Sequence, residues 1–310
     1  MQGLSLPYSL RYRSVPDKNL IGRRVVVRRV WRPTGQPHAA GGEDRMADSP
    51  RQLLRNSVKD KLARNEVVAS MIVRLVRTIE IAQIARTAGF DSFYVDMEHN
   101  SFSPDTTGQL CMAGLAAGIA PFVRVPSIEP EHIARALDGG ALGVIAPHLV
   151  SARDAQRVVR AAKFAPLGDR SIAGGLPHLQ FRSFSTAETI EALNEATMVV
   201  VMIETAEALA AVDEIAAVEG VDLLLVGTND LCSSLGIPGQ LDHDKVRDSY
   251  LKAMEACRKH GKHLGVGGLS AHPTLARDFV KLGARYVSTG TDLSFLLGAA
   301  TAKAKQVREF

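Results

Sequence analysis

The chain has 310 residues, of which 46% are apolar and 23% are charged, as is ordinary for a soluble globular protein. The formal net charge is +4, but residues 1–45 hold eight Arg and one Lys against three acids, which leaves about −2 for the rest. We therefore expect no basic face for nucleic acid. No apolar run approaches the roughly 20 residues that span a bilayer. Three cysteines without paired spacing (Cys111, Cys232 and Cys257) indicate a reducing cytoplasm and no zinc site.

Residues 1–45 differ from the rest in their Arg pairs, scattered prolines and lack of a helical repeat. One interpretation is a transit peptide, because the segment is rich in Arg and poor in acids. The other is that the natural start is Met46, since MADSPRQLLRN opens with a capped helix. We favour the second, because the leader lacks an amphipathic repeat. We predict a basic, flexible extension over 1–45 and a single domain over 46–310.

From Ser49 onward, helices alternate with short apolar strands. Ser49-Pro50 caps a first helix that is expected to run to about Arg64. The predicted strands cover 67–73, 92–98, 121–126, 143–147, 198–203, 221–226, 263–266 and 286–289. The predicted helices between and after them cover 78–88, 104–117, 130–137, 152–163, 186–195, 206–218, 244–260 and the chain from about 293.

Eight short apolar strands separated by helices are typical of a parallel sheet covered on both faces. The count fits a closed (β/α)8 TIM barrel, and this length often forms one such domain. A doubly wound open sheet is the alternative, but no G-x-G-x-x-G follows the first strand. In a barrel the side chains at the carboxyl ends of the strands converge. The polar residues at those ends are therefore the candidates for the site.

The stretch FDSFYVDMEHNSFS, residues 90–103, ends a strand with Asp96, Glu98 and His99. A carboxylate at Asp96 could orient the His99 imidazole and raise its basicity. The alternative is a helix N-cap followed by a surface histidine. Polar residues at three later strand ends favour the catalytic interpretation.

Glu204 and Asp230 end two successive apolar strands. An ionised carboxylate after VVVMI is costly without a cation or hydrogen-bond donors. Two hard oxygen ligands on adjacent strands, with water and substrate completing the shell, describe a Mg²⁺ or Mn²⁺ site. Each residue alone could instead be a helix N-cap.

Arg124 lies within the apolar strand of PFVRVPSIEP. It could pair with a core acid, or its planar fork could hold a substrate carboxylate or a developing oxyanion. No lysine lies at the carboxyl end of a predicted strand, which argues against Schiff-base catalysis. Cys232 has no neighbouring base in sequence and is expected to pack as a small apolar group.

The chain resembles the HpcH/HpaI aldolase family, the metal-dependent class II pyruvate aldolases. The resemblance is carried by GFDSFYVDMEHNSFS, PFVRVPSIEPEHIARALDGGALGVIAPHL with AKFAPLGDRS, and VMIETAEAL with VEGVDLLLVGTNDLCSSLG, over roughly residues 50–305. It implies a (β/α)8 barrel, commonly a hexamer built as a trimer of dimers, with a C-terminal helix exchanged between subunits.

The resemblance also implies roles for individual residues. Glu204 and Asp230 would be the metal ligands, His99 the catalytic base with Asp96 as its orienting partner, and Arg124 the residue that holds pyruvate and steadies its enolate. Asp138 matches another acid of the family's site region.

The sequence departs from the family at Met202, Thr228 and Asn229, which with Arg124 are the predicted substrate-binding residues. Met202 stands where many members have Gln, and GTNDL replaces GPADL, which puts Thr228 and Asn229 at the substrate rim and leaves the acceptor undetermined. His148 and the loop 174–180 could also contact substrate, or could be ordinary loop or interface structure.

The resemblance implies reversible cleavage of a 4-hydroxy-2-oxo acid to pyruvate and an aldehyde through a metal-stabilised pyruvate enolate, with Mg²⁺, Mn²⁺ or Co²⁺ as cofactor. His99 would take the 4-hydroxyl proton. An acyl-CoA lyase of the citrate lyase beta type and an oxaloacetate decarboxylase use related chemistry and remain alternatives. The first would need a basic CoA-binding rim, which the sequence lacks. An assembly subunit with a dead site is disfavoured, because every predicted site group is present.

Overall fold

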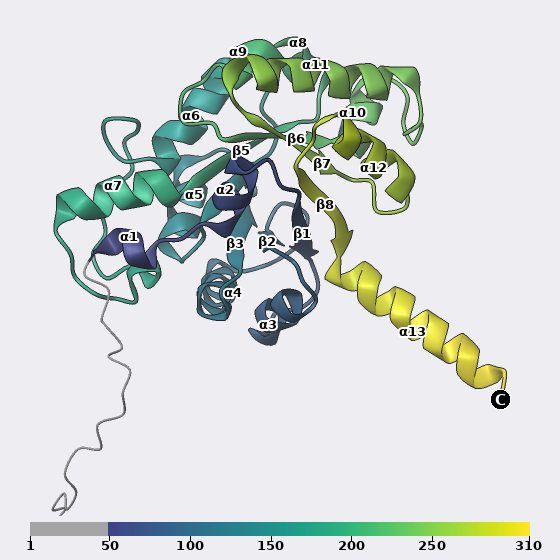
Figure 1. The fold of residues 1–310 in the computed structure, drawn as a ribbon, viewed down its shortest axis with the longest axis horizontal. Coiled ribbons are helices and arrows are strands. Elements are labelled where there is room, and N and C mark those ends of the chain that lie inside the picture. Colours follow the sequence, from purple (N-terminus) through teal and green to yellow (C-terminus); the bar gives the residue numbers. More distant parts are fainter. Residues whose placement is uncertain (1–48) are drawn as a thin grey trace, which may run out of the picture. The chain divides into compact units, whose positions relative to one another are not determined.

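A computed structural model describes residues 49–310, and there the eight predicted strands close into one parallel barrel (Figure 1). The extension 1–45 and the predicted boundary at Met46 lie outside the described residues, so both remain predictions. Each strand pairs with the next along the chain, and β8 pairs with β1 to close the ring. The strands are β1 (Val68–Val73), β2 (Ser92–Asp96), β3 (Ala120–Arg124), β4 (Gly143–Ala146), β5 (Met198–Ile203), β6 (Leu223–Gly227), β7 (His263–Gly267) and β8 (Tyr286–Thr291). The predicted (β/α)8 barrel is confirmed, and the open sheet is excluded.

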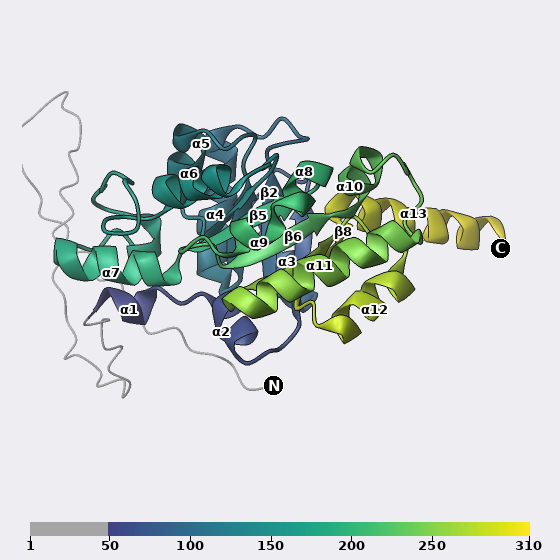
Figure 2. The ribbon, with the colours of Figure 1, turned by 90° about the horizontal axis from the view of Figure 1, so that it is seen from above.

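The helices surround the barrel (Figures 1 and 2). They are α1 (Pro50–Leu53), α2 (Ser57–Ala63), α3 (Glu80–Thr87), α4 (Pro104–Ala117), α5 (Pro130–Asp138), α6 (Ala152–Ala162), α7 (Thr186–Ala196), α8 (Ala206–Ala210), α9 (Val212–Ala216), α10 (Thr228–Ser234), α11 (Asp244–His260), α12 (Pro273–Leu282) and α13 (Asp292–Arg308), with a 3-10 turn η1 (Pro177–Leu179). Among residues 49–310, none of the helices is both long and apolar enough to cross a bilayer.

The first predicted helix is split in two, because Asn56 caps a new helix rather than continuing the old one. Its side-chain oxygen accepts from the N–H of Val58 and Lys59, so α2 starts at Ser57. Its amide also donates to backbone carbonyls of Leu142 and Ala196. Asn56 thus ties α2 to the amino-terminal end of the barrel.

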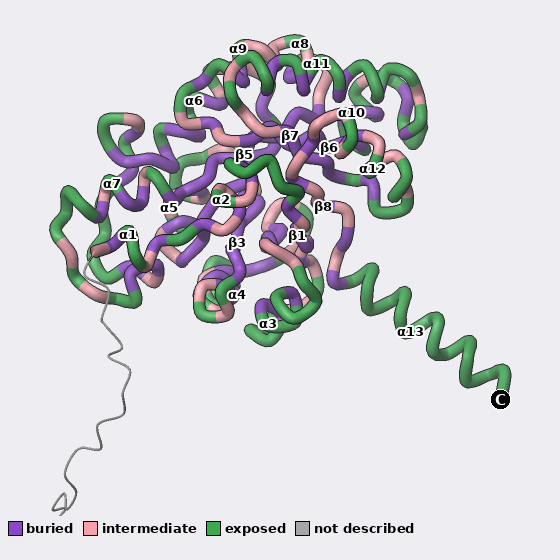
Figure 3. The backbone as a smooth tube through the Cα atoms, in the orientation of Figure 1, coloured by how far each residue is buried: buried purple, intermediate pink, exposed green. Residues whose placement is uncertain are grey.

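Two apolar layers follow from the alternation of side chains along each strand. The inward-facing residues of the strands form one layer, which fills the barrel interior. The residues that alternate with them along each strand face outward and form the second layer, against the helices. Figure 3 shows the strands largely buried, as expected for a parallel sheet covered by helices. The interior layer contains Tyr94, Phe122, Ile145, Met198, Val200, Met202, Leu223, Leu225 and Tyr286.

Helix α13 projects away from the barrel, as both views show (Figures 1 and 2). Its first residue, Asp292, is buried, and every residue from 293 to 310 is exposed (Figure 3). The exposed positions include large apolar side chains, namely Leu293, Phe295, Leu296 and Leu297. A helix that buries so little apolar surface within one chain gains little stability from packing.

Candidate active site

Polar side chains from successive strand ends meet at the carboxyl end of the barrel. Asp96 ends β2 and Arg124 ends β3, and the two are paired in register. Arg124 Nε lies 2.9 Å from Asp96 Oδ1, and Arg124 Nη2 lies 2.7 Å from Oδ2. This is a bidentate pair, and the Asp96 carboxylate in it is fully buried. Of the two interpretations of Arg124, pairing with a core acid is therefore what the structure displays.

Each member of this ion pair stabilises the charged form of the other. Burial alone would raise the pKa of Asp96, but the Arg124 hydrogen bond and charge outweigh it and hold the pKa below its usual value. Burial would likewise lower the pKa of Arg124, and the bond to Asp96 reverses this. Both groups are therefore ionised at neutral pH.

Asp96 fixes the following turn rather than the His99 imidazole. Its Oδ1 accepts from the backbone N–H of Glu98 at 3.2 Å and of His99 at 3.3 Å, and its Oδ2 accepts from Asn100 Nδ2 at 3.0 Å. The ring of His99 instead has its Nε2 at 3.7 Å from Glu98 Oε2, and its side chain is 49% exposed. The expected contact between the Asp96 carboxylate and the imidazole is thus not the one formed, because Arg124 and the turn take both oxygens.

Glu98 was not among the predicted site residues, yet it lies at the centre of the site. One carboxylate oxygen is 2.8 Å from Arg124 Nη1, and the other is 2.8 Å from His148 Nε2. Its side chain is only 6% exposed. The signal for it was the group of three titratable residues, Asp96, Glu98 and His99, at the end of β2.

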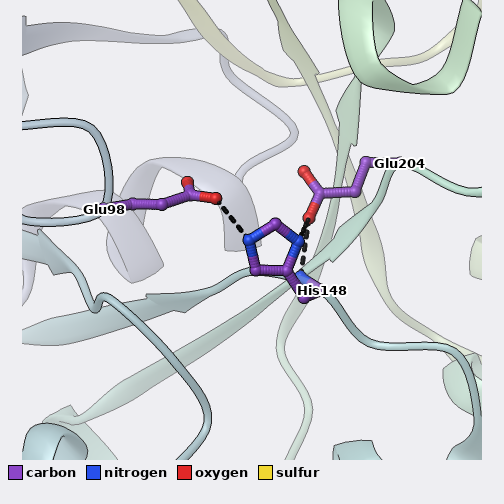
Figure 4. Close-up of side chains that lie close together, drawn as sticks. All are labelled: Glu98, His148 and Glu204. Carbon is purple, nitrogen blue, oxygen red and sulfur yellow. Dashed lines mark hydrogen bonds and ion pairs between the residues drawn. The ribbon is translucent and has the colours of Figure 1, made fainter. Parts of the chain in front are cut away.

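Glu204 follows β5 and faces the same space (Figure 4). Its Oε1 accepts the backbone N–H of His148 at 2.6 Å, and His148 Nδ1 lies 3.4 Å from the same oxygen. His148 has a φ of 60°, an uncommon conformation for a residue other than glycine, which presents its N–H to Glu204. Gly227 leaves room for this carboxylate, since a Cβ there would lie 3.0 Å from Glu204 Oε2.

The residues around Glu204 fit a divalent cation. Glu98, His148 and Glu204 offer ligand atoms that lie within 4.8 Å of one another (Figure 4). Burial raises the pKa of Glu204, the His148 N–H opposes the rise, and the charges of Glu98 and Asp230 add to it. A cation would offset that concentration of negative charge. Carboxylate oxygens are the ligands that hard divalent cations prefer.

Asp230, the second predicted ligand, lies outside this group of three. It is exposed in the first turn of α10, which starts directly after β6. Its negative charge adds to the rise in the pKa of Glu204. The predicted ligand pair therefore remains a prediction, and Glu98 and His148 are additional candidates.

The predicted substrate-binding residues Thr228, Asn229 and Met202 differ in their access to the mouth. Thr228 is fully buried, and its hydroxyl donates to the Gly267 carbonyl at 2.7 Å and lies 2.8 Å from the Tyr250 hydroxyl. The Thr228 hydroxyl is thus hydrogen-bonded within the outer layer, between the barrel and its helices, and does not face the mouth. Asn229 is exposed and donates to the Gly268 carbonyl at 3.2 Å. Met202 is buried in the interior layer.

Asp138 and the loop 174–180 lie away from this mouth within one chain. Asp138 ends α5, and because each helix runs back toward the amino ends of the strands, it lies at the opposite end of the barrel. Arg170 Nη2 donates to it at 2.7 Å. His178 in the loop lies 2.9 Å from the Ala141 carbonyl, just before β4.

Comparison with known proteins places this geometry in a family. The sequence model of the HpcH/HpaI aldolase/citrate lyase family matches residues 69–299. A 4-hydroxy-4-methyl-2-oxoglutarate aldolase of Chaetomium globosum is 39% identical over 216 residues, covering 69% of this chain and 80% of that protein. One of the same name from Hapsidospora irregularis is 38% identical over 248 residues, covering 79% and 92%. The crystal structure of an HpcH/HpaI aldolase from Desulfitobacterium hafniense superimposes with a TM-score of 0.78 at 30% identity, covering 83% and 98%. With more than half of its length matched, the chain belongs to the HpcH/HpaI aldolase/citrate lyase family.

Proposed function

We propose that the protein is a divalent-metal pyruvate aldolase that reversibly cleaves a 4-hydroxy-2-oxo acid to pyruvate and a carbonyl compound. The observation that carries the proposal is the continuous row from Arg124 through Glu98 and His148 to Glu204, in which a guanidinium stands beside a candidate cation site. The activities in the names of the relatives support it, since two of them are aldolases acting on a 4-hydroxy-2-oxo acid.

Arg124 is suited to hold the pyruvate half of the substrate. A guanidinium has five N–H donors, and three nitrogen contacts commit it to Asp96 and Glu98. Donors therefore remain for a substrate carboxylate or for the enolate oxygen that forms on cleavage. The bond to Asp96 fixes the guanidinium before substrate arrives, so no reorganisation is needed during the reaction.

His99 is suited to move the proton of the 4-hydroxyl group. Its imidazole is half exposed at the mouth, and Nε2 lies 3.7 Å from Glu98 Oε2. A histidine near neutral pH can accept the hydroxyl proton as the C3–C4 bond breaks and can return a proton in the reverse direction. The backbone bond to Asp96 holds the start of this turn in place.

Glu204 and Asp230 would hold the cation, with Glu98 and His148 as further groups in reach of it. Mg²⁺ or Mn²⁺, or alternatively Co²⁺, would supply Lewis-acid stabilisation of negative charge on the substrate oxygens. Glu204 would contribute a buried, fixed oxygen, and Asp230 an accessible one. The expected pyruvate site therefore lies between Arg124 and Glu204.

The test is a metal-dependence assay with product analysis. Protein treated with EDTA should lose cleavage of 4-hydroxy-2-oxo acids, and Mg²⁺, Mn²⁺ or Co²⁺ should restore it, with pyruvate identified by mass. A Glu204→Gln variant should bind Mn²⁺ more weakly in a calorimetric titration. Full cleavage by metal-free Glu204→Gln protein would overturn the proposal. Oxaloacetate and 3-hydroxyacyl-CoA in the same panel test the two alternative activities.

The assembly belongs to the same proposal. The exposed apolar side chains of α13 fit a helix exchanged with a neighbouring subunit in a hexamer. Light scattering should then give six chains per particle, and a chain ending at Thr291 should give fewer. A full-length monomer in solution would contradict the expected exchange. The cytoplasmic location expected from the sequence also remains a prediction.

A further inference from the structure

Asp292 is a buried carboxylate at the carboxyl end of the barrel that the roles above do not use. It is the first residue of α13, directly after β8, and it is 5% exposed. Its two oxygens accept the backbone N–H of Arg74 at 2.9 Å, of Leu75 at 3.0 Å and of Val76 at 2.8 Å. These three residues directly follow β1. One side chain at the end of β8 therefore holds the loop that leaves β1.

The helix α13 does not need this carboxylate as its cap. Thr291 is the N-cap: its hydroxyl accepts the N–H of Ser294, and the Ser294 hydroxyl accepts the N–H of Thr291. Asp292 accepts one N–H of its own helix, that of Leu293, at 2.8 Å. The rest of its bonding capacity is directed to the loop after β1. Because a buried carboxylate is costly unless donors meet its charge, the loop and the carboxylate stabilise each other.

The loop after β1 carries Arg74 at the mouth of the barrel. Arg74 Nε lies 3.4 Å from Asp96 Oδ2, the oxygen to which Arg124 Nη2 donates at 2.7 Å. The two guanidinium groups thus approach one carboxylate oxygen, from β1 and from β3 on either side of β2. The Arg74 side chain is 38% exposed, and among residues 49–310 this is the one polar contact of its guanidinium. Its place beside Asp96 therefore depends on the backbone that carries it.

The formal charges around Arg124 show what Arg74 adds to the site. Arg124 contacts the carboxylates of Asp96 and Glu98, whose side chains are fully buried and 6% exposed. One positive and two negative charges give this group a net charge of −1, which repels the carboxylate of a 2-oxo acid. Arg74 brings the sum to zero. Because the two carboxylates are shielded from solvent, the effect of a further cation beside them is only weakly screened.

We propose that Asp292 is a positioning residue for substrate binding and that it acts through Arg74. By holding the loop after β1, Asp292 keeps the Arg74 charge beside Asp96, so that Arg124 continues to attract an anionic substrate. This assignment rests on the proposed aldolase function and adds two residues to it. Both residues set the affinity of the site for the 2-oxo acid rather than the rate at which the C3–C4 bond breaks, so their loss raises KM and leaves kcat nearly unchanged.

The test is a double-mutant cycle of Asp292→Asn, Arg74→Gln and the two together, assayed for cleavage of a 4-hydroxy-2-oxo acid at saturating Mg²⁺. Arg74→Gln should raise KM by about 10-fold and change kcat by less than about twofold, because only a charge that acts on binding is lost. Asp292→Asn, which keeps the size of the side chain, should raise KM by a similar factor. The double variant should resemble Arg74→Gln alone, because both substitutions act on one charge, whereas independent structural losses would add.

Hydrogen exchange measures the loop directly. The amides of residues 74–76 should exchange faster in Asp292→Asn and at the wild-type rate in Arg74→Gln, which leaves the bonds to the carboxylate intact. Asp244→Asn is the matched control. Asp244 is the first residue of α11 and is exposed, so this variant makes the same change at the same helix position with no loop to hold. It should keep the wild-type KM and exchange rates.

An unchanged KM in Asp292→Asn, a loss confined to kcat, or additive KM losses in the double variant would overturn the assignment and leave the aldolase function intact. Wild-type exchange rates at residues 74–76 in Asp292→Asn would do the same. Arg74→Gln alters a partly exposed side chain, so an unchanged KM in that variant overturns the assignment even where Asp292→Asn does not fold. Absence of cleavage by the wild-type protein would overturn the aldolase function as well.

Discussion

The Asp96 carboxylate and the Arg124 guanidinium form a buried two-pronged ion pair across β2 and β3, with nitrogen–oxygen distances of 2.9 and 2.7 Å. The same carboxylate binds the backbone N–H of Glu98 and His99. One group therefore sets the orientation of the guanidinium and the path of the turn that carries two other site residues. The candidate site at the carboxyl end of the barrel is organised around this pair.

We predict that Asp96→Asn destabilises the protein and abolishes cleavage. Removing one partner of a buried ion pair leaves the other charge uncompensated and typically costs about 3–5 kcal/mol. Urea denaturation should detect a loss of this size in the free energy of unfolding. The control is Asp105→Asn on the surface of α4, where a change within about 0.5 kcal/mol is expected. A loss below about 1 kcal/mol in Asp96→Asn would contradict the role given to the pair.

The barrel itself was predictable because its strands are locally unambiguous. VVVMI and LLLV are apolar runs of strand length, and each is bounded by a helical segment. Strands that are apolar at every position have no face suited to solvent, which indicates a parallel sheet covered by helices on both faces. The split at Asn56 was missed, because its side chain caps the next helix through contacts that only the tertiary structure brings together.

Part of the site could also have been found from the alternation of side chains. Asp96 shares the inward parity of Tyr94, and Arg124 that of Phe122, so their pairing follows from adjacent strands. Thr228 has the parity of the outward-facing Val226, which places its hydroxyl away from the mouth. The pairing of Asp96 with Arg124 and the outward position of Thr228 can therefore be predicted from the strand register alone.

The roles of Glu98 and His148 could not have been found in this way. Both residues follow their strands, so no alternation rule fixes the direction of their side chains. Glu98 reaches His148 only because Asp96 turns the chain after β2, and His148 meets Glu204 through a positive φ. Contacts of this kind depend on the conformation of two loops that lie 50 residues apart.

Gly227 is predicted to be required for the cation site. A Cβ at this position would lie 3.0 Å from Glu204 Oε2 and 3.0 Å from Met202 Cε. Gly227→Ala should therefore displace the Glu204 carboxylate and weaken Mn²⁺ binding by about 10–100-fold, the range seen when groups that support a ligand are lost. Calorimetric titration with Mn²⁺ measures this directly. Gly174→Ala, where nothing lies within 4 Å of the added carbon, should bind as the wild type does. Equal affinities in the two variants would exclude this role.

The stability of the protein should fall as the pH drops from about 6.5 to about 4, in part through His178. Burial lowers the pKa of His178 to about 4, the Ala141 carbonyl opposes this, and the charge of Arg170 adds to it. An unfolded histidine titrates near 6.5, so between the two values the unfolded chain binds a proton that the folded chain excludes. The contribution is complete above pH 6.5, and up to about 1.4 kcal/mol is lost per pH unit below it.

Denaturation curves at several pH values measure this slope. His178→Gln should unfold at a lower denaturant concentration at pH 7 but with a shallower dependence on pH. His272→Gln, at a half-exposed position, should keep the wild-type slope. A slope unchanged by the His178 substitution would show that other groups cause the acid sensitivity.

His99 and Arg124 should fail in different ways when each is replaced by alanine. If His99 is the base for the 4-hydroxyl proton, His99→Ala should lose cleavage but retain exchange of the pyruvate methyl protons, which does not involve that hydroxyl. Arg124→Ala should impair both reactions, because it removes the charge that we propose holds pyruvate and faces the enolate oxygen. Loss of one such electrostatic contact typically costs about 10²–10³ in rate.

The measurement is deuterium exchange into pyruvate by NMR alongside cleavage kinetics, with both variants at saturating metal. Because Arg124 also compensates the charge of the buried Asp96, the free energy of unfolding of the Arg124→Ala protein is measured in parallel. The Arg124→Lys variant separates loss of the positive charge from loss of the planar guanidinium. Normal cleavage by His99→Ala, or unimpaired exchange by Arg124→Ala, would show that the roles are assigned wrongly. Equal loss of both reactions in both variants would merge the two roles into one.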